Sequence, residues 1–388
     1  MNDKIVDQLL SLACGGVQGL KPYEAGKPIS ELEREYGVSN VVKLASNENP
    51  LGTSKKVREA IESCIDDIAQ YPDGSAFYLK NAIAEFLTND SQPIHENNII
   101  IGNGSNDVLE IIAHCFADQS AEVIYSQHAF AVYPIVTQAV GAKHVATPAL
   151  NWGHDLNAMA NAISEKTRLI FIANPNNPTG TLLDGKSLHS FLSTVPDNVI
   201  VVVDEAYHEF VEDAGYQSAL NWISEFPNLI VTRTFSKAYG LAGLRVGYGV
   251  SHPVVTNILN RVRQPFNANS IALAAAQAAL SDEDFLSESV KVNKEGMRQL
   301  TEAFTKMSLE YIPSAGNFVC VDIKADGKIV YEALLRKGVI VRPVGPYQMP
   351  NHIRVSVGSS SENAIFITAL KDVLDELVSA SSVKLEAQ

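Results

Sequence analysis

Short apolar runs recur along the chain from about residue 98 onward, and segments with helical spacing separate several of them. The runs that we expect to form strands are Ile99–Ile101, Ala121–Tyr125, His144–Thr147, Leu169–Ala173, Val199–Val203 and Asn228–Val231. Apolar runs of this length are typical of strands buried on both faces. Their alternation with helices predicts an α/β fold with a mostly parallel sheet flanked by helices, and function at the carboxyl ends of the strands.

Length and charge narrow the classes of protein. With 388 residues, 46% of them hydrophobic, the chain can bury a large core in more than one structural unit. The net charge of −14 argues against nucleic acid or an anionic membrane as a partner. The N-terminus does not resemble a signal peptide, and no apolar run approaches the roughly 20 residues of a membrane span. We therefore expect a soluble, cytoplasmic protein.

Metal and disulfide chemistry are not indicated. The four cysteines lie far apart without a C-x-x-C pair: Cys14, Cys64, Cys115 and Cys320. His208-Glu209 begins a segment that lacks the second histidine of the H-E-x-x-H zinc motif. We expect no bound metal.

Polar residues follow two of the predicted strands directly. Asn174–Gly180 comes after one strand, and its two prolines should present Asn177 rigidly. Asp204 follows the all-apolar run Val199–Val203. Burying a carboxylate at such a position is unfavourable unless it meets a cation, so Asp204 is a candidate for a functional ion pair.

A third strand end carries the reactive candidate, Lys237. Hydroxyls precede it at Thr232, Thr234 and Ser236, glycines and alanines surround it, and Arg245 follows. Hydroxyls and an arginine can hold a phosphate, and small residues allow close approach of the backbone. A lysine whose pKa is lowered by neighbouring cationic charge can form a Schiff base with an aldehyde. The alternative is a strand end followed by a glycine-rich turn with a solvated lysine.

A glycine-rich turn, Gly102–Asp107, lies between a predicted strand and the predicted helix 108–116. Unpaired backbone N–H groups converge at such a place and favour an anion. The turn matches neither the dinucleotide fingerprint nor the P-loop motif, so it predicts phosphate binding without a nucleotide.

Together these groups are the set that pyridoxal phosphate requires. Lys237 would hold the aldehyde and later carry a proton, and Asp204 would pair with the pyridinium nitrogen. Asn177 and Tyr207 would donate to the phenolic oxygen. The residues expected around the phosphate are Ser105, Asn106, Thr234, Ser236 and Arg245.

Three motifs, in this order and spacing, resemble the fold-type-I aminotransferases of the aspartate aminotransferase superfamily: Asn174–Gly180, Asp204–Tyr207 and Ser236–Arg245. Within that superfamily the chain is similar to the histidinol-phosphate aminotransferases, on the segments Lys21–Tyr23, Leu44–Pro50, Tyr71–Gly74 and Arg354–Gly358. The resemblance covers nearly the whole chain. It implies an N-terminal arm over 1–45, a large cofactor-binding domain over 46–275 and a small C-terminal α/β domain over 276–388.

The resemblance also implies a homodimer, in which Tyr71 reaches the cofactor phosphate of the neighbouring subunit. Phe130 matches the aromatic residue that stacks on the cofactor ring, often a tyrosine in this family, so any hydrogen bond of that hydroxyl is lost. Arg354 matches the arginine that grips the substrate's carboxylate, and here it would also serve a phosphate. Arg342 and Tyr23 would supplement the grip, and Asn47 lies in the expected binding loop.

By the same resemblance, the reaction would convert histidinol phosphate and 2-oxoglutarate to imidazole-acetol phosphate and glutamate in histidine synthesis. An aromatic amino-acid aminotransferase and a threonine-phosphate decarboxylase would share this site. A binding or regulatory protein without turnover is a further alternative, which the intact Lys237 and its partners argue against. Asn317 would either touch substrate or cap a local turn.

Overall fold

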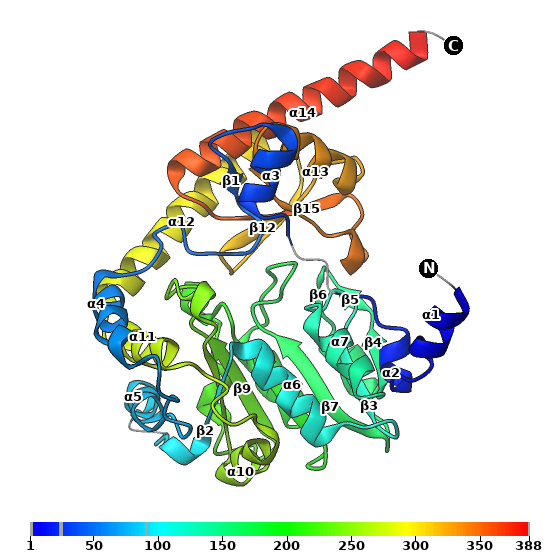
Figure 1. Cartoon of the computed structure of the whole chain (residues 1–388). Coiled ribbons are helices and arrows are strands. Elements are labelled where there is room, and N and C mark those ends of the chain that lie inside the picture. The colour runs from blue at the N-terminus through cyan, green and yellow to red at the C-terminus, as the bar shows by residue number, and fades with distance from the viewer. Residues whose placement is uncertain (1–2, 23–25, 90–91, 387–388) are drawn as a thin grey trace.

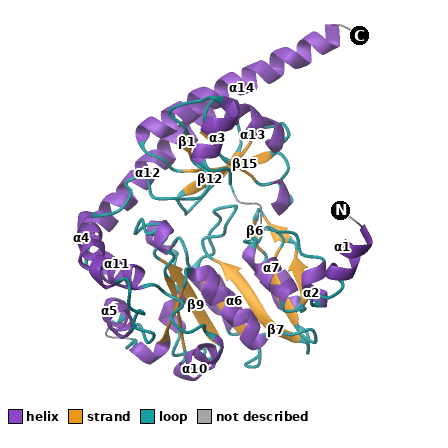
Figure 2. Cartoon of the chain, viewed as in Figure 1, coloured by secondary structure: helices purple, strands orange, loops and turns teal. Residues whose placement is uncertain are grey.

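The computed structural model describes residues 3–22, 26–89 and 92–386. Figure 1 shows a large body with one extended sheet and, above it, a smaller body beside the last three helices. Strands form the interior of both bodies and helices lie around them (Figure 2). Among the described residues, no helix combines the length and apolarity that crossing a membrane requires.

The large sheet has seven strands in the order β2-β10-β9-β8-β7-β3-β4. β3, β4, β7, β8 and β9 pair in parallel, and β10 is antiparallel to both of its neighbours. The predicted mostly parallel sheet is therefore confirmed. The strands are β2 (Ile99–Gly102), β3 (Glu122–Ser126), β4 (Lys143–Thr147), β7 (Thr167–Ala173), β8 (Ile200–Asp204), β9 (Leu229–Thr234) and β10 (Gly247–Ser251).

Strand β10 escaped prediction because two of its residues, Gly247 and Gly249, interrupt the apolar pattern. Close packing explains Gly247: an added Cβ would lie 2.5 Å from the backbone nitrogen of Ser105. The glycine lets the start of the following helix approach the sheet.

Helices cover both faces of this sheet. Alternate residues of β8 enter separate apolar clusters, with Val201 and Val203 in one and Val202 in the other. The helices of the large body are α4 (Lys55–Ser63), α5 (Phe77–Leu87), α6 (Ser105–Phe116), α7 (Val132–Ala139), α8 (Leu156–Asn161), α9 (Gly185–Leu192), α10 (Pro253–Val262) and α11 (Ser270–Leu280). A hairpin, β5 (Ala149–Leu150) and β6 (Gly153–His154), follows β4, and α1 (Asp3–Leu10) and α2 (Gly15–Gln18) precede the sheet in sequence. Short 3₁₀ turns lie at Ile65–Asp67, Glu96–Asn98, His208–Phe210, Ala219–Trp222, Ala242–Leu244 and Gly345–Tyr347.

The small body has a four-stranded antiparallel sheet in the order β11-β12-β15-β14. Its strands are β11 (Tyr311–Ile312), β12 (Phe318–Asp322), β14 (Arg342–Pro343) and β15 (His352–Ser356), and its helices are α12 (Glu283–Lys306), α13 (Gly327–Arg336) and α14 (Ser360–Glu386).

A segment near the N-terminus joins this small body. β1 (Val42–Lys43) pairs in parallel with β13 (Val339–Ile340), and α3 (Ile29–Tyr36) precedes it. Val42 and Leu44 share an apolar cluster with residues of β12 and β15. The domain limits 1–45, 46–275 and 276–388 stay a prediction, and β1 shows that the first segment contacts the last.

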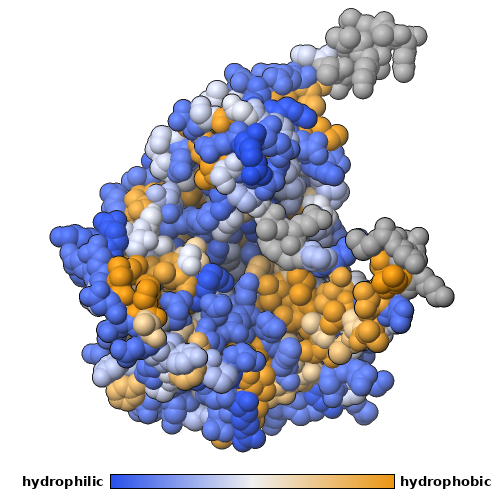
Figure 3. Space-filling model, viewed as in Figure 1, coloured by the Kyte–Doolittle hydropathy of each residue, from blue (hydrophilic) through white to orange (hydrophobic). Residues whose placement is uncertain are grey.

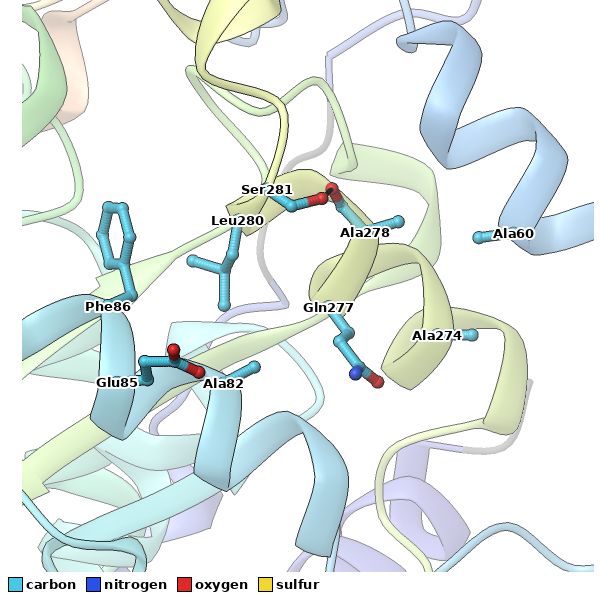
Figure 4. A pocket seen from close by; sticks show the side chains of 9 residues that line it. All are labelled: Ala60, Ala82, Glu85, Phe86, Ala274, Gln277, Ala278, Leu280 and Ser281. Atoms are coloured by element: carbon cyan, nitrogen blue, oxygen red, sulfur yellow. Dashed lines mark hydrogen bonds between the residues drawn. The ribbon is translucent and has the colours of Figure 1, made fainter.

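The surface has apolar areas away from the sheets. Figure 3 shows apolar side chains around α1 and around α11, at the places where Figure 1 puts these helices. A groove of about 610 Å³ lies between α4, α5 and α11. Figure 4 shows its lining, with Ala60 from α4, Glu85 and Phe86 from α5, and small residues from α11. Glu85 is the one ionisable group among the residues that line this groove, so the groove has no lysine or arginine that could bind an aldehyde or a phosphate.

Gly37 and Gly240 both have a left-handed backbone conformation but differ in how closely their surroundings pack. Substituting each by alanine therefore distinguishes the cost of the conformation from the cost of a steric clash. Gly37 has φ +65° and open space where a Cβ would lie, whereas a Cβ on Gly240, φ +71°, would lie 2.1 Å from the carbonyl oxygen of Gly52. We expect Gly37→Ala to lower the free energy of unfolding by about 1–2 kcal/mol. Gly240→Ala should lower it clearly further, as measured by urea denaturation. Equal losses would mean that the loop at Gly52 moves away freely.

Candidate active site

A cavity of about 330 Å³ lies between the carboxyl ends of β7, β8 and β9 and the strands β14 and β15 of the small body. The predicted site residues that line it are Asn47, Ser105, Asn106, Phe130, Asn177, Asp204, Tyr207, Thr234, Ser236, Lys237, Arg245, Arg342 and Arg354. Two predicted residues do not appear there: Tyr71 lies elsewhere, and Tyr23 falls outside the described residues. Side chains predicted from separate strand ends thus meet in one place.

Lys237 lies just beyond β9 with its amine inside the cavity wall. Its Nζ donates a hydrogen bond to the carbonyl oxygen of Ser46 at 2.9 Å. Burial, and then the charge of Arg354, lower the pKa of this amine to about 7. A large fraction of Lys237 is therefore neutral and nucleophilic near neutral pH.

Asp204 ends β8 and is buried. Its two carboxylate oxygens accept hydrogen bonds from Tyr133 Oη and Thr232 Oγ1, each at 3.0 Å. Burial raises the pKa of Asp204 to about 6, although these hydrogen bonds favour the ionised form. A cationic ligand group beside this carboxylate would stabilise its ionised form.

Sequence reasoning missed the contact between Tyr133 and Asp204. Tyr133 lies on α7, and its ring stacks on Phe171 with centroids 4.7 Å apart. The ring of Phe130 contacts the Tyr133 ring edge-on, with centroids 5.8 Å apart. The available signal was a tyrosine three residues after Phe130, a spacing that places both on one side of a helical turn. The sequence indicates Thr232 only as one of several hydroxyls before Lys237, and its hydrogen bond to Asp204 becomes evident only in the structure.

Asn47 connects both bodies at the cavity wall. Its Nδ2 donates to Tyr207 Oη at 2.9 Å, and its Oδ1 accepts from Ser356 Oγ at 3.0 Å. Asn317 Nδ2 donates to the carbonyl oxygen of Asn47 at 3.0 Å. Asn317 therefore holds the loop that carries Asn47. Burial raises the pKa of the Tyr207 phenol to about 12, so that the phenol keeps its proton.

One anion-binding corner is built around the start of α6. Gly104 precedes this helix with φ +84°, and no side chain caps the helix, so its first N–H groups face the corner. Arg245 Nη1 donates to Ser236 Oγ at 3.1 Å. A Cβ on Gly104 would lie 2.4 Å from Arg245 Nη2, so the glycine leaves the room that this guanidinium occupies. Thr234, Ser105 and Asn106 complete the lining.

A second cationic corner comes from the small body. Arg354 on β15 donates from Nη1 to Asn177 Oδ1 at 2.6 Å and from Nη2 to the carbonyl oxygen of Ala45 at 2.8 Å. Its Nε is buried without a hydrogen-bond partner among the described residues. Arg342 on β14 lies opposite Arg354 in the sheet register and also lines the cavity. The two corners can therefore hold two separate anionic groups.

Tyr71 points away from the cavity of its own chain. Its side chain is 84% exposed, and its ring stacks on Phe266 with centroids 4.8 Å apart. Its predicted part in a neighbouring subunit stays a prediction, to which an exposed ring is suited.

The raised pKa of Asp204 predicts a pH dependence of stability. Between pH 4 and 6 the folded chain holds this proton more tightly than the unfolded chain, so stability falls as pH rises through that window. The loss for a shift from 3.8 to about 6 is on the order of 3 kcal/mol. Asp204→Asn should remove this slope from the unfolding free energy of the ligand-free protein. Parallel curves for both proteins would contradict it.

The chain is similar in sequence to known aminotransferases. The family model for aminotransferase class I and II matches residues 39–370. Histidinol-phosphate aminotransferase 1 of Nitrosococcus oceani is 56% identical over 94% of this chain and 97% of its own length. That of Idiomarina loihiensis is 54% identical over 93% and 97%.

The fold has the same relatives. The crystal structure of histidinol-phosphate aminotransferase from Sinorhizobium meliloti, in complex with pyridoxal-5'-phosphate, superposes with a TM-score of 0.86 at 29% identity and covers 94% of this chain and 97% of that one. A Thermus thermophilus aspartate aminotransferase variant, at 22% identity and a TM-score of 0.80, shares the fold. The predicted fold type I and the resemblance drawn from the motifs are confirmed, and the chain belongs to the class I and II aminotransferase family.

Proposed function

We propose that this chain is a pyridoxal-phosphate-dependent aminotransferase that converts histidinol phosphate and 2-oxoglutarate to imidazole-acetol phosphate and glutamate in histidine biosynthesis. The observation that carries the proposal is one cavity in which a lysine of lowered pKa, a buried carboxylate and two cationic corners meet. The names of relatives more than half identical over nearly the whole chain support the choice of substrate.

The donor set fits pyridoxal phosphate. Lys237 is the buried amine for the aldehyde, and Asp204 is a carboxylate in need of a cation, which a protonated ring nitrogen provides. The cofactor phosphate would lie at the uncapped start of α6. There it would be held by Ser105, Asn106, Thr234, Ser236 and Arg245.

The ring would lie between these ends. Phe130 would stack on one of its faces, and Asn177 Nδ2 and Tyr207 Oη would donate to its phenolic oxygen. Asn177 can do so because its other amide atom, Oδ1, already accepts from Arg354. Tyr207 can do so because its phenol stays protonated and receives its own hydrogen bond from Asn47.

When bound, pyridoxal phosphate supplies an electron-accepting ring. The chain's own residues supply binding and proton transfer. With a pKa near 7, the Lys237 amine is suited both to accept a proton from a bound substrate and to give one back. Asp204, held by Tyr133 and Thr232, would supply the negative charge that a protonated ring nitrogen requires.

Arg354 and Arg342 would bind the anionic group of each substrate. Histidinol phosphate carries a phosphate where glutamate carries its α-carboxylate, and a guanidinium accepts either group. Arg354 is held in place from both bodies, by Asn177 and by the carbonyl of Ala45. We propose that Asn47 and Tyr23 complete the substrate side.

We further propose that the active unit is a homodimer in which Tyr71 reaches the partner's phosphate corner. The exposed position of Tyr71, away from its own cavity, supports this arrangement.

The absorbance spectrum of the protein loaded with pyridoxal phosphate tests the proposed reaction. Histidinol phosphate at low concentration should bleach the visible band, and 2-oxoglutarate should restore it, because each half-reaction changes the form of the cofactor. Lys237→Ala should abolish turnover and slow the spectral change by at least about 1,000-fold, since its amine is the proposed proton carrier. A stronger response to phenylalanine would indicate an aromatic amino-acid aminotransferase, and release of carbon dioxide would indicate a decarboxylase.

Mixing two inactive variants tests the dimer. Tyr71→Ala and Lys237→Ala chains, co-expressed in equal amounts, form mixed dimers in which one of the two sites has both native residues. Random pairing should therefore restore about a quarter of wild-type activity. Tyr78→Ala, a variant of another exposed tyrosine, should not impair activity when made alone. No recovery in the mixture, although mixed dimers are detected by mass, would place Tyr71 outside the partner's site.

A further inference from the structure

A buried ion pair lies on the face of the large sheet opposite to the active site. At the ends of β8 and β9, Asp204 and Thr232 face the cavity side. Glu205, directly after β8, and Arg233, the next residue of β9, face the other way. Successive residues of a strand alternate between the two faces, so the ion pair is the direct neighbour of the hydrogen bond between Asp204 and Thr232. The backbone bond from Glu205 N to the carbonyl oxygen of Thr232, 2.9 Å, joins the two rows.

The pair is fully connected. Arg233 donates from Nε at 3.1 Å and from Nη2 at 2.8 Å to Glu205 Oε2. Ser218 Oγ donates to both oxygens of Glu205, and Ala219 N donates to Oε1 at 2.7 Å. The Arg233 and Glu205 side chains are 6% and 1% exposed. The pair therefore ties β8, β9 and the segment around Ser218 into one unit.

Stability alone does not account for this pair. Desolvating two charges offsets most of their attraction, and apolar side chains at such positions are commonly as stabilising. Two residues earlier along the chain, and on the same face of the sheet, Val203 and Val231 do pack into the apolar core. The ion pair replaces that packing only where the strands end and the site begins. Unlike apolar packing, the hydrogen bonds of the ion pair are directional, so they fix the distance and orientation of the two strand ends relative to each other.

We propose that Glu205 and Arg233 are positioning residues that hold the ends of β8 and β9 in register, so that Asp204 and Thr232 meet the cofactor ring with fixed geometry. Neither side chain touches the cavity. The pair carries no net charge as a whole, although the nearby Glu205 carboxylate by itself raises the pKa of Asp204. This inference rests on the cofactor named in the proposed function.

The test removes both charges together, because a single substitution would leave a buried charge unpaired. The variant is Glu205→Gln with Arg233→Met, and the control is Glu212→Gln with Lys294→Met, an exposed ion pair whose side chains are 53% and 67% exposed. Three quantities are measured on the full chain: the dissociation constant for pyridoxal phosphate, the pH midpoint of its visible absorbance, and the midpoint of thermal unfolding without cofactor.

We expect the double variant to bind the cofactor about tenfold more weakly, the scale found for residues that orient a ligand from behind, and to shift the absorbance midpoint. The thermal midpoint should change little, and the control should change none of the three. A lowered thermal midpoint with an unchanged dissociation constant and absorbance midpoint would overturn the proposal, because the pair would then be purely structural.

A second variant keeps the test decisive if the double variant does not fold. Arg233→Lys keeps the charge but replaces the two-pronged guanidinium with a single ammonium. Weaker cofactor binding in this variant supports positioning by geometry, and wild-type binding overturns it. A wild-type protein that shows no cofactor absorbance would instead refute the proposed function.

Discussion

The site depends on a carboxylate that is almost completely buried at the cavity wall. Asp204 ends an apolar strand, and burial raises its pKa to about 6, although hydrogen bonds from Tyr133, Thr232 and the backbone of Ala206 favour its charged form. That arrangement is unfavourable by itself and becomes favourable when a cation binds. Much of the surrounding structure serves this one group: the stacked ring of Tyr133, the end of β9 and the ion pair behind the strands.

Cationic side chains from both bodies line the same cavity and balance this negative charge. Lys237, Arg245, Arg342 and Arg354 line the same space, and the charge of Arg354 helps to keep the Lys237 amine neutral. The positive charges are separated into two corners, so that one can hold a fixed phosphate and the other a changing substrate. The hydrogen bond from Arg354 to Asn177 joins the corner on the small body to the sheet of the large one.

Much of the fold and most of the cavity lining could be predicted from the sequence, because both follow from the pattern of residues within short segments. Apolar runs locate the parallel strands, and the polar residues that follow each run, such as Asp204 and Asn177, lie at the carboxyl edge by geometry. The motifs around Lys237 then identify the chemistry. These inferences need only the order of residues along the chain.

Contacts between distant segments could not be read in this way. Several contacts of the site depend on how separate elements pack. They are those of Tyr133 with Asp204, of Asn317 and Ser356 with Asn47, and of Glu205 with Arg233 and Ser218. Strand β10 was not predicted because it contains two glycines, Gly247 and Gly249. Both allow α6 to pack closely against the sheet.

The pairing of β1 with β13 has a consequence for the order in which the protein matures. Val42 and Lys43 emerge early during synthesis, but their partners Val339 and Ile340 are added only when most of the chain has been made. The loop that bears Asn47 follows β1 and is held by Ser356 and Asn317, which are also late. The large sheet can assemble from contacts between neighbouring elements before then. The wall of the cavity that contains Asn47 and Arg354 is therefore completed last, so a nascent chain would not gain a closed cofactor site until its small body has folded.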